Sequence, residues 1–415
     1  MIAAPLRPLY GFGERNSGSW LLLRSTKAAP GTEMPSRTCR EMRPGTLWPG
    51  RAPRLLDAPV INPFKTLLRT SKRSGKRQAS AILLLQRIWQ PPEPKTKGAK
   101  TRAKPLRRKV SRSTLRPTRP EPGTFVDGLF SSPHGKLAYK LYTPTGSSRR
   151  RLPLVVMLHG CGQSAADFAV GTDMNKLADE RGFLVLYPQQ STSANLGRCW
   201  NWHSPLDQKR GSGEPAIIAA LTAHIISTSK ANSTRVYIAG ISAGGAAAAI
   251  IAAAYPDLYI AAGVHSGLAV GEVRTLRGAL SAMRNGPRAA GVTKTARPPP
   301  CIVFHGDQDR VVHPSNASGF LSHLLRSSPR SLTSRTQRGR SSGGREFTRT
   351  VYGYGLRDVL LEDWTVHGSG HAWSGGSPAG SHTDPAGPDA SREMIRFFLA
   401  RKRLVAKVPR TRAGA

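Results

Sequence analysis

The chain has 415 residues and a formal net charge of +38 at pH 7, from 62 Lys and Arg against 24 Asp and Glu. No window holds the ~18 uninterrupted apolar residues that a membrane-spanning helix needs. The four cysteines are too sparse for a disulfide scaffold and lack zinc-type spacing. We therefore expect no transmembrane segment, no metal and no cofactor.

The first 120 residues carry 27 Lys and Arg against 5 Asp and Glu, mixed with Pro and Ser and few apolar patches. This composition predicts a disordered basic low-complexity extension at 1–120, and a second basic tail follows at 403–415. So many cations can attract polyanions, but no basic-plus-aromatic module indicates a specific nucleic-acid site. No signal peptide is legible, because Arg7, Glu14 and Arg15 interrupt any apolar core.

From residue 121 to 402 strand and helix patterns alternate, which predicts an α/β domain with a mostly parallel central sheet and helices on both faces. Antiparallel edge strands are expected within 123–145, and continuous apolar runs indicate buried strands. A segment at 326–349 holds seven arginines among serines and glycines and is predicted to be a surface loop. The other predicted strands are 154–158, 183–187, 236–239, 260–264, 301–304, 348–352 and 359–366, and the predicted helices are 165–181, 214–229, 243–254 and 390–401.

The pentapeptide at 240–244 reads GISAG and lies between a predicted strand and an alanine-rich helix. A nucleophile elbow needs this strand–turn–helix context, because its serine sits in a strained turn with small residues two positions on either side. Ser242 is therefore the predicted nucleophile.

A serine nucleophile needs a histidine base and a carboxylate that orients it, in the chain order Ser, Asp, His on this kind of scaffold. Asp309 follows a predicted buried strand and is the favoured acid, with Asp307 as the competing residue that more readily shapes the turn. His371 lies in a glycine-rich loop after the last strand and is the favoured base. His367, nearer the strand end, is the alternative.

Acyl transfer also needs hydrogen-bond donors for the developing oxyanion. The backbone N–H groups of Cys161, in a glycine-rich turn after a strand, and of Ala243, just after the nucleophile, fit this role. Trp200, Trp202 and Trp373 fall in loops at the same sheet edge and are predicted to line the substrate site. A disulfide between Cys161 and Cys199 and a pair of free thiols are equally compatible with the sequence.

Taken together, these motifs closely resemble the esterase / poly(3-hydroxybutyrate) depolymerase family of α/β hydrolases, over nearly all of 121–402. The resemblance implies an α/β-hydrolase fold and a serine esterase for short-chain hydroxyalkanoate esters, with Ser242, Asp309 and His371 as the catalytic triad. The motifs that carry it are LHGC at 158–161, RCWNW at 198–202, GISAGG at 240–245, HGDQD at 305–309 and GHAWSGG at 370–376.

Other readings stay open. Feruloyl and acetylxylan esterases look similar in the same motifs, so a plant-cell-wall ester is an alternative substrate to a hydroxyalkanoate oligomer or polymer. A catalytically inactive basic protein that binds polyanions is an alternative of a different class, and a peptidase on the same scaffold is a third. The resemblance implies an extracellular or periplasmic location, whereas the lack of a legible signal leaves the cytoplasm possible.

Overall fold

The computed structural model describes residues 20–23, 123–146, 151–271, 273, 275–287, 298–355 and 358–403. The basic extension and the basic tail therefore lie outside the described residues, except for a short segment and Arg403. That segment is strand β1 (Trp20–Leu23), which pairs antiparallel with β9 (Leu332–Arg340). Four residues for which the sequence predicted no regular structure thus join the sheet.

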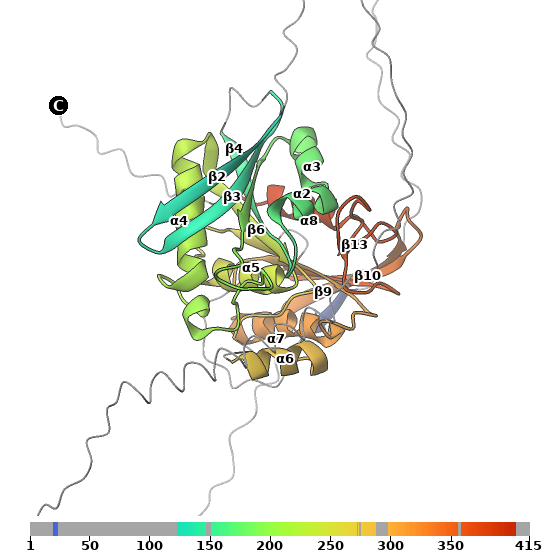
Figure 1. Ribbon diagram of the computed structural model, residues 1–415. Helices are drawn as coiled ribbons and strands as arrows, with labels where there is room; N and C mark the ends of the chain where they lie inside the picture. The colour runs from blue at the N-terminus through green and yellow to red at the C-terminus, as the bar shows by residue number, and fades with distance from the viewer. Residues whose placement is uncertain are drawn as a thin grey trace, which may run out of the picture. The chain divides into compact units, whose positions relative to one another are not determined.

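The described residues form a large sheet whose strand order is β1-β9-β10-β11-β8-β7-β6-β4-β5-β3-β2 (Figure 1). The strands from β11 to β5 in this order pair parallel, whereas the flanking strands pair antiparallel. The predicted mostly parallel sheet with antiparallel edge strands is therefore confirmed. The remaining strands of this sheet are β2 (Thr124–Ser132), β3 (Gly135–Thr143), β4 (Leu152–Leu158), β5 (Leu184–Gln189), β6 (Ala231–Ile241), β7 (Ala261–His265), β8 (Cys301–Gly306), β10 (Glu346–Gly353) and β11 (Val359–Val366).

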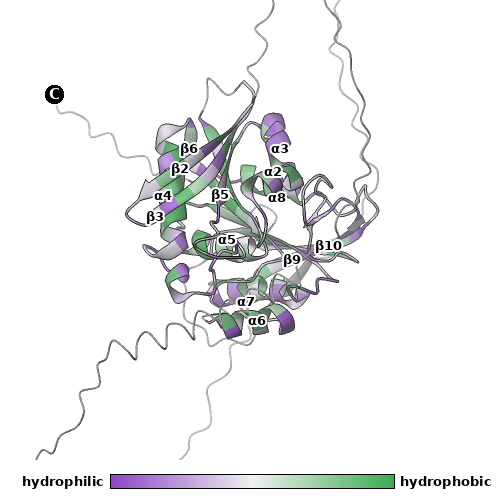
Figure 2. Ribbon diagram, in the orientation of Figure 1, coloured by the Kyte–Doolittle hydropathy of each residue, from purple (hydrophilic) through white to green (hydrophobic). Residues whose placement is uncertain are grey.

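Helices cover both faces of the sheet, which explains why the central strands are apolar without alternation. In β4, every residue from Pro153 to Leu158 is buried. One core cluster joins the sheet to α4, α5, α6 and α7, and the other joins it to α2, α3 and α8. Figure 2 shows polar positions, in purple, on the outer parts of α3 and α6. The helix bounds are α2 (Ala165–Thr172), α3 (Met174–Arg181), α4 (Gly213–Thr228), α5 (Ala243–Ala254), α6 (Leu276–Asn285), α7 (Ala317–Ser327) and α8 (Ala390–Leu399).

The helix predicted at 165–181 is two helices, α2 and α3. Asp173 separates them with φ 51° and ψ 21°, a left-handed conformation that ends the first helix. Aspartate tolerates this conformation better than most residues, which the apolar pattern alone does not reveal. The helices α6 and α7, and the 3₁₀ turns η2 (Pro205–Gln208) and η3 (Pro314–Asn316), were not predicted.

The prediction of a surface loop at 326–349 is wrong. Most of this segment forms β9 and the first part of β10, an antiparallel pair that extends the sheet beyond β11. Cross-strand contacts stabilise the arginines there, since Arg340 Nη2 lies 2.5 Å from Glu346 Oε1. An arginine-rich composition therefore concealed a pair of strands whose exposed faces are polar.

The strands β12 (Trp373–Ser374) and β13 (Thr383–Asp384) follow β11 in the chain and form a small parallel sheet. Their pairing fixes the end of the loop that carries His371. Among the described helices, none is long and apolar enough to span a bilayer.

Candidate active site

Ser242 occupies the sharp turn between β6 and α5. Its φ of 57° and ψ of −121° place a non-glycine residue in a region that L-residues rarely adopt, as a nucleophile elbow requires. Its N–H donates to the His265 carbonyl at 2.9 Å, and its own carbonyl accepts from Ala246 N–H at 2.9 Å. These bonds hold the strained turn, and the side chain lies where the strand meets the helix.

The two glycines that flank the elbow are required by close backbone approach. A Cβ added to Gly240 would lie 2.4 Å from the Gly244 carbonyl oxygen and 2.6 Å from the Leu158 carbonyl oxygen. A Cβ added to Gly244 would lie 2.2 Å from that same Leu158 oxygen. Because backbone atoms cannot yield as a flexible side chain can, only glycine fits either position.

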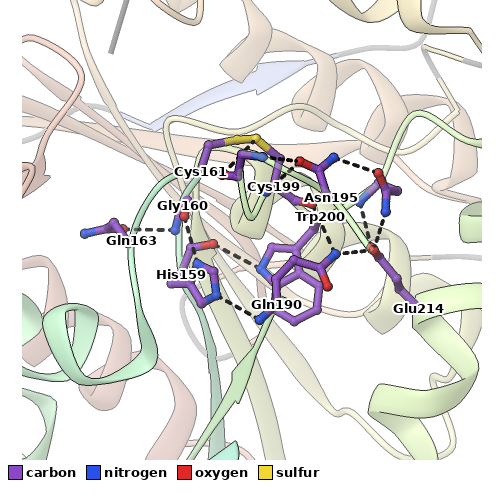
Figure 3. The surroundings of a disulfide bond; sticks show 11 residues. His159, Gly160, Cys161, Gln163, Gln190, Asn195, Cys199, Trp200 and Glu214 are labelled. Carbon is purple, nitrogen blue, oxygen red and sulfur yellow. Dashed lines mark hydrogen bonds between the residues drawn. A yellow bond between two sulfur atoms is a disulfide. The ribbon is translucent and has the colours of Figure 1, made fainter. Parts of the chain in front are cut away.

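The glycine-rich turn after β4 is stapled to the loop that follows β5. Cys161 and Cys199 form a disulfide with a Cα–Cα distance of 4.2 Å, which resolves the choice that the sequence left open (Figure 3). Gly162 N–H also donates to the Gly197 carbonyl at 2.8 Å. Within the turn, Gly160 N–H donates to Gln163 Oε1 at 2.9 Å. The backbone of Cys161 is thus held from both sides.

Ala243, the other predicted oxyanion donor, is the first residue of α5. Backbone N–H groups in the first turn of a helix have no carbonyl partner within that helix, so they are suited to an anion.

The tryptophans predicted to line the substrate site are buried. Trp200 and Trp373 are each only 1% exposed, and Trp202 is 7% exposed. Trp200 Nε1–H donates to the His159 carbonyl at 3.1 Å, and Trp373 Nε1–H donates to Ser391 Oγ at 3.0 Å. Enclosure and these hydrogen bonds give Trp200 and Trp373 a packing role, and contact of the three tryptophans with a substrate stays a prediction.

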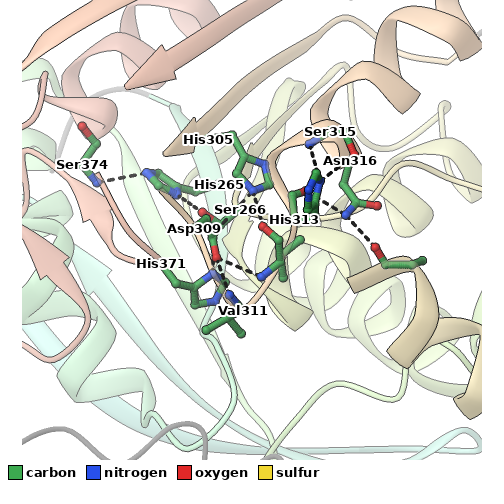
Figure 4. Close-up of polar contacts among 12 residues, drawn as sticks. His265, Ser266, His305, Asp309, Val311, His313, Ser315, Asn316, His371 and Ser374 are labelled. Atoms are coloured by element: carbon green, nitrogen blue, oxygen red, sulfur yellow. Dashed lines mark hydrogen bonds and ion pairs between the residues drawn. The ribbon is translucent and has the colours of Figure 1, made fainter. Parts of the chain in front are cut away.

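Asp309 and His371 lie together, although 62 residues separate them in the chain (Figure 4). His371 Nδ1 is 2.7 Å from Asp309 Oδ2. The other oxygen, Oδ1, accepts the N–H groups of Val311 and Val312 at 2.9 Å each. The carboxylate is thereby oriented toward the histidine, as a triad acid must be.

The charge of Asp309 is stabilised by hydrogen bonds in a buried place. Burial would raise the pKa of this carboxyl, but hydrogen bonds from His305 and His371 outweigh it and hold the pKa below its usual range. His305 Nε2 lies 3.4 Å from Asp309 Oδ2 and 2.8 Å from the Val312 carbonyl. The sequence did not predict this contact of His305 with the acid, because spacing along the chain does not show which side chains meet.

The competing residues form a pair of their own. His367 Nδ1 lies 2.9 Å from Asp307 Oδ2, and Gly368 N–H donates to Asp307 Oδ1 at 2.7 Å. His367 Nε2 is 2.9 Å from Thr348 Oγ1 on β10. Both ring nitrogens of this histidine are therefore engaged by side chains away from β6.

The sheet order brings the nucleophile near the first of these pairs. The strands β6, β7 and β8 are neighbours, so Ser242 and Asp309 follow strand ends that are two spacings, or ~10 Å, apart. His265, at the end of β7 between them, accepts the Ser374 N–H at 3.0 Å. The segment that carries His371 is thereby tethered beside the elbow, at the carboxyl edge where open α/β sheets bind ligands.

The network around Glu214 was not predicted from the sequence. Glu214 lies in the first turn of α4 and accepts hydrogen bonds from Gln190 and Asn201, behind the stapled turn. A glutamate near the start of a helix is common, so the sequence held no signal that would distinguish this one.

Comparison with known proteins identifies the family and the fold. The family described as "Esterase PHB depolymerase" matches residues 137–346. Poly(3-hydroxyalkanoate) depolymerase C of Paucimonas lemoignei is 29% identical over 58% of this chain and 60% of its own length. Feruloyl esterase B of Thermothelomyces thermophilus is 30% identical over 53% of this chain and 78% of its own length. The chain thus spans well under two thirds of the depolymerase.

Among solved structures, an acetyl xylan esterase from Aspergillus awamori aligns with a TM-score of 0.50 and 19% identity, over 68% of this chain and all of that one. This likeness confirms the predicted α/β-hydrolase fold. Since the family match covers half of the sequence and lies on the elbow, the turn and the acid loop, the chain belongs to the esterase PHB depolymerase family.

Proposed function

We propose that this chain is a serine esterase that hydrolyses short-chain esters of the hydroxyalkanoate type, with Ser242, His371 and Asp309 as its catalytic triad. The observation that carries the proposal is the buried hydrogen bond of 2.7 Å between His371 Nδ1 and Asp309, at the same sheet edge as a serine in a strained elbow. Family membership and the depolymerase relative support the substrate class.

The reaction begins when Ser242 Oγ attacks the ester carbonyl carbon while its proton passes to His371 Nε2. Asp309 keeps Nδ1 protonated, which leaves Nε2 as the basic nitrogen. The carbonyl oxygen becomes an oxyanion that accepts hydrogen bonds from the backbone N–H groups of Cys161 and Ala243. Collapse of this intermediate expels the alcohol, which takes the proton from His371 and leaves an acyl group on Ser242.

Water then completes the cycle. It attacks the acyl carbonyl while His371 takes its proton, and collapse of the second intermediate releases the carboxylic acid and returns the proton to Ser242. These steps need water and no cofactor. Trp202, which lies on the stapled loop and is 7% exposed, stays in the proposed substrate-binding set with Trp200 and Trp373.

The test compares hydrolysis of a chromogenic butyrate ester by the wild type and by Ser242→Ala. We expect the substitution to lower turnover about 10³-fold or more. Equal and negligible turnover of several esters by both proteins would contradict the proposal.

A second candidate is a feruloyl or acetylxylan-type carbohydrate esterase, favoured by the 30% identical feruloyl esterase. The chemistry is the same and only the ester differs. Specificity constants for hydroxybutyrate oligomers, feruloyl esters and acetylated xylan, measured in parallel, decide between the two, because the better substrate has the larger kcat/KM.

We also propose an extracellular or periplasmic location, since the Cys161–Cys199 disulfide is stable in an oxidising compartment. Contact of the basic extension with polyanions is a separate proposal that rests on its charge. Salt-sensitive binding of the full chain to a DNA fragment, unchanged in Ser242→Ala, would support it, and no binding at low salt would contradict it.

A further inference from the structure

Glu214 receives three hydrogen bonds from two residues of neighbouring segments. Its Oε1 accepts from the side-chain amides of Gln190 and Asn201, the latter at 2.8 Å. Its Oε2 accepts the backbone N–H of Asn201 at 2.7 Å. All three partners are donors, and only a carboxylate offers acceptor oxygens on both sides. The carboxylate therefore sets the position of the end of β5 and of the loop that carries Cys199 (Figure 3).

The first branch of this network runs through Gln190. Its Nε2 also donates to the Cys199 carbonyl at 3.1 Å, and its backbone N–H donates to His159 Nε2 at 3.1 Å. Burial lowers the pKa of His159 to about 4, so the ring is neutral at physiological pH. Because Nε2 accepts, Nδ1 carries the proton and donates to the Gly160 carbonyl at 2.8 Å. This branch ends on the glycine-rich turn.

The second branch runs through Asn201. Its Oδ1 accepts from Asn195 Nδ2 at 2.9 Å, and Asn195 Oδ1 in turn accepts the N–H groups of Gly197 and Cys199 at 3.0 and 3.3 Å. The Gly197 carbonyl accepts the Gly162 N–H, and Cys199 is joined to Cys161 by the disulfide. This branch also ends on the glycine-rich turn, at Cys161 itself and at Gly162.

We propose that Glu214 is a positioning residue that holds the Cys161 N–H at the point where the oxyanion forms. This inference rests on the proposed esterase function, and it assigns a role to a carboxylate that does not touch the substrate. Rates depend steeply on donor placement, since the loss of one oxyanion donor costs about 10²–10³ in kcat. Displacement of the turn should therefore weaken binding of the transition state while binding of the ester itself changes little.

The test substitutes Glu214→Gln. The amide keeps one acceptor oxygen and turns an NH₂ group toward a donor, so at least one of the three hydrogen bonds is lost. Burial, reinforced by the charge of Asp207, raises the pKa of Glu214 to about 7, so removal of the charge relieves a cost and the variant is expected to fold. The matched control is Glu180→Gln, the same change at a surface residue that pairs with Arg392.

We expect Glu214→Gln to lower kcat for a butyrate ester about 10-fold or more, with KM within about twofold of wild type. Affinity for an alkylboronic acid, which forms a tetrahedral adduct on the serine, should weaken by a similar factor. Glu180→Gln should change neither. A well-folded Glu214→Gln with wild-type kcat and boronate affinity would overturn the proposal.

Two further measurements keep the test decisive. Asn201→Ala removes the side chain that links Glu214 to Asn195, and leaves Glu214 its bonds from Gln190 and from the backbone N–H of residue 201. It should lower kcat in the same direction, so an unchanged kcat in Asn201→Ala would overturn the proposal if Glu214→Gln does not fold. Hydrogen exchange in a peptide over 159–163 should accelerate in Glu214→Gln and not in Glu180→Gln, and equal rates would overturn the positioning role even without enzyme activity. Failure of the esterase function itself would appear separately, as a wild type no more active than Ser242→Ala.

Discussion

Asp309 with His371 and Asp307 with His367 are two aspartate–histidine pairs on the same two loops. The hydrogen bonds are alike, at 2.7 and 2.9 Å between Nδ1 and a carboxylate oxygen. The surroundings differ. The side chains of His371 and Asp309 are 5% and 0% exposed, whereas those of His367 and Asp307 are 40% and 33% exposed. Local sequence thus offers the same chemistry twice, and burial together with the position of each pair relative to β6 distinguishes them.

The more exposed pair, Asp307 with His367, has a structural role. Asp307 accepts the Gly368 N–H, and His367 contacts Thr348 on β10, so the pair joins the two loops to the edge of the sheet. A histidine engaged at both ring nitrogens is poorly placed to serve as a base. The buried pair, Asp309 with His371, is the one beside the elbow. Four experiments test the difference between the two pairs.

The largest difference is expected between His371→Ala and His367→Ala. Loss of the base should lower kcat about 10⁴-fold or more, because Ser242 then has no acceptor for its proton. His367→Ala should leave kcat within about threefold of wild type, with a stability loss of about 1 kcal/mol from the lost hydrogen bonds. Steady-state kinetics and thermal unfolding measure both effects. The reverse order of activities would assign the base to His367.

A slightly smaller difference is expected between Asp309→Asn and Asp307→Asn. The amide at 309 favours the wrong tautomer of His371, so kcat should fall about 10³–10⁴-fold while the fold is retained. The amide at 307 should change kcat no more than about threefold. Similar losses in both variants would mean that the two pairs act as one unit, and the distinction would not stand.

Gly306 directly precedes Asp307 and packs against the loop between His367 and His371, so its substitution should disturb both pairs. A Cβ at this position would lie 2.2 Å from the Ser369 carbonyl oxygen and 2.7 Å from the Gly370 carbonyl oxygen. We expect Gly306→Ala to displace the loop that carries His371, lowering kcat about 10-fold and stability by about 1–3 kcal/mol. Ser369→Ala keeps the backbone contact and removes only the hydrogen bond from Ser369 Oγ to Asp384 Oδ2 at 2.6 Å, so it measures the cost of a lost side-chain contact in the same loop. A Gly306→Ala variant with wild-type kcat would show that the loop moves without cost.

The smallest effect concerns the pH dependence of stability. The folded-state pKa of Asp309 lies below its unfolded value, so its contribution to stability is present above the unfolded pKa and is lost as pH falls through the folded pKa. The difference in unfolding free energy between wild type and Asp309→Asn should therefore be constant near neutral pH and shrink below about pH 4, by about 1 kcal/mol or more. Urea unfolding from pH 3 to 7 measures it. A difference that grows toward acid pH would contradict the charge assigned to Asp309.

Predictions from the sequence failed where side chains on one face of an element are exposed. The segment of β9 and β10 carries arginines that pair with Glu346 and Glu362, so it lacks the apolar run by which β4 and β8 are recognised. Composition favoured a loop there, although neighbouring strands supply the backbone hydrogen bonds. The burial of Trp200 and Trp373 was not predicted either, because the sequence shows that they lie near loops but not how those loops pack.

The sequence by itself determined the alternation of strands and helices, the elbow at Ser242 and the order of the proposed nucleophile, acid and base. These depend on local physics: apolar runs, glycines at points of close approach and turn residues at strand ends. Only the tertiary structure decided which histidine each aspartate meets, that Cys161 and Cys199 are joined, and that Glu214 lies behind the oxyanion turn. Each of these contacts joins residues that are at least 13 positions apart in the chain. At such separations, distance in the chain carries no information about distance in space.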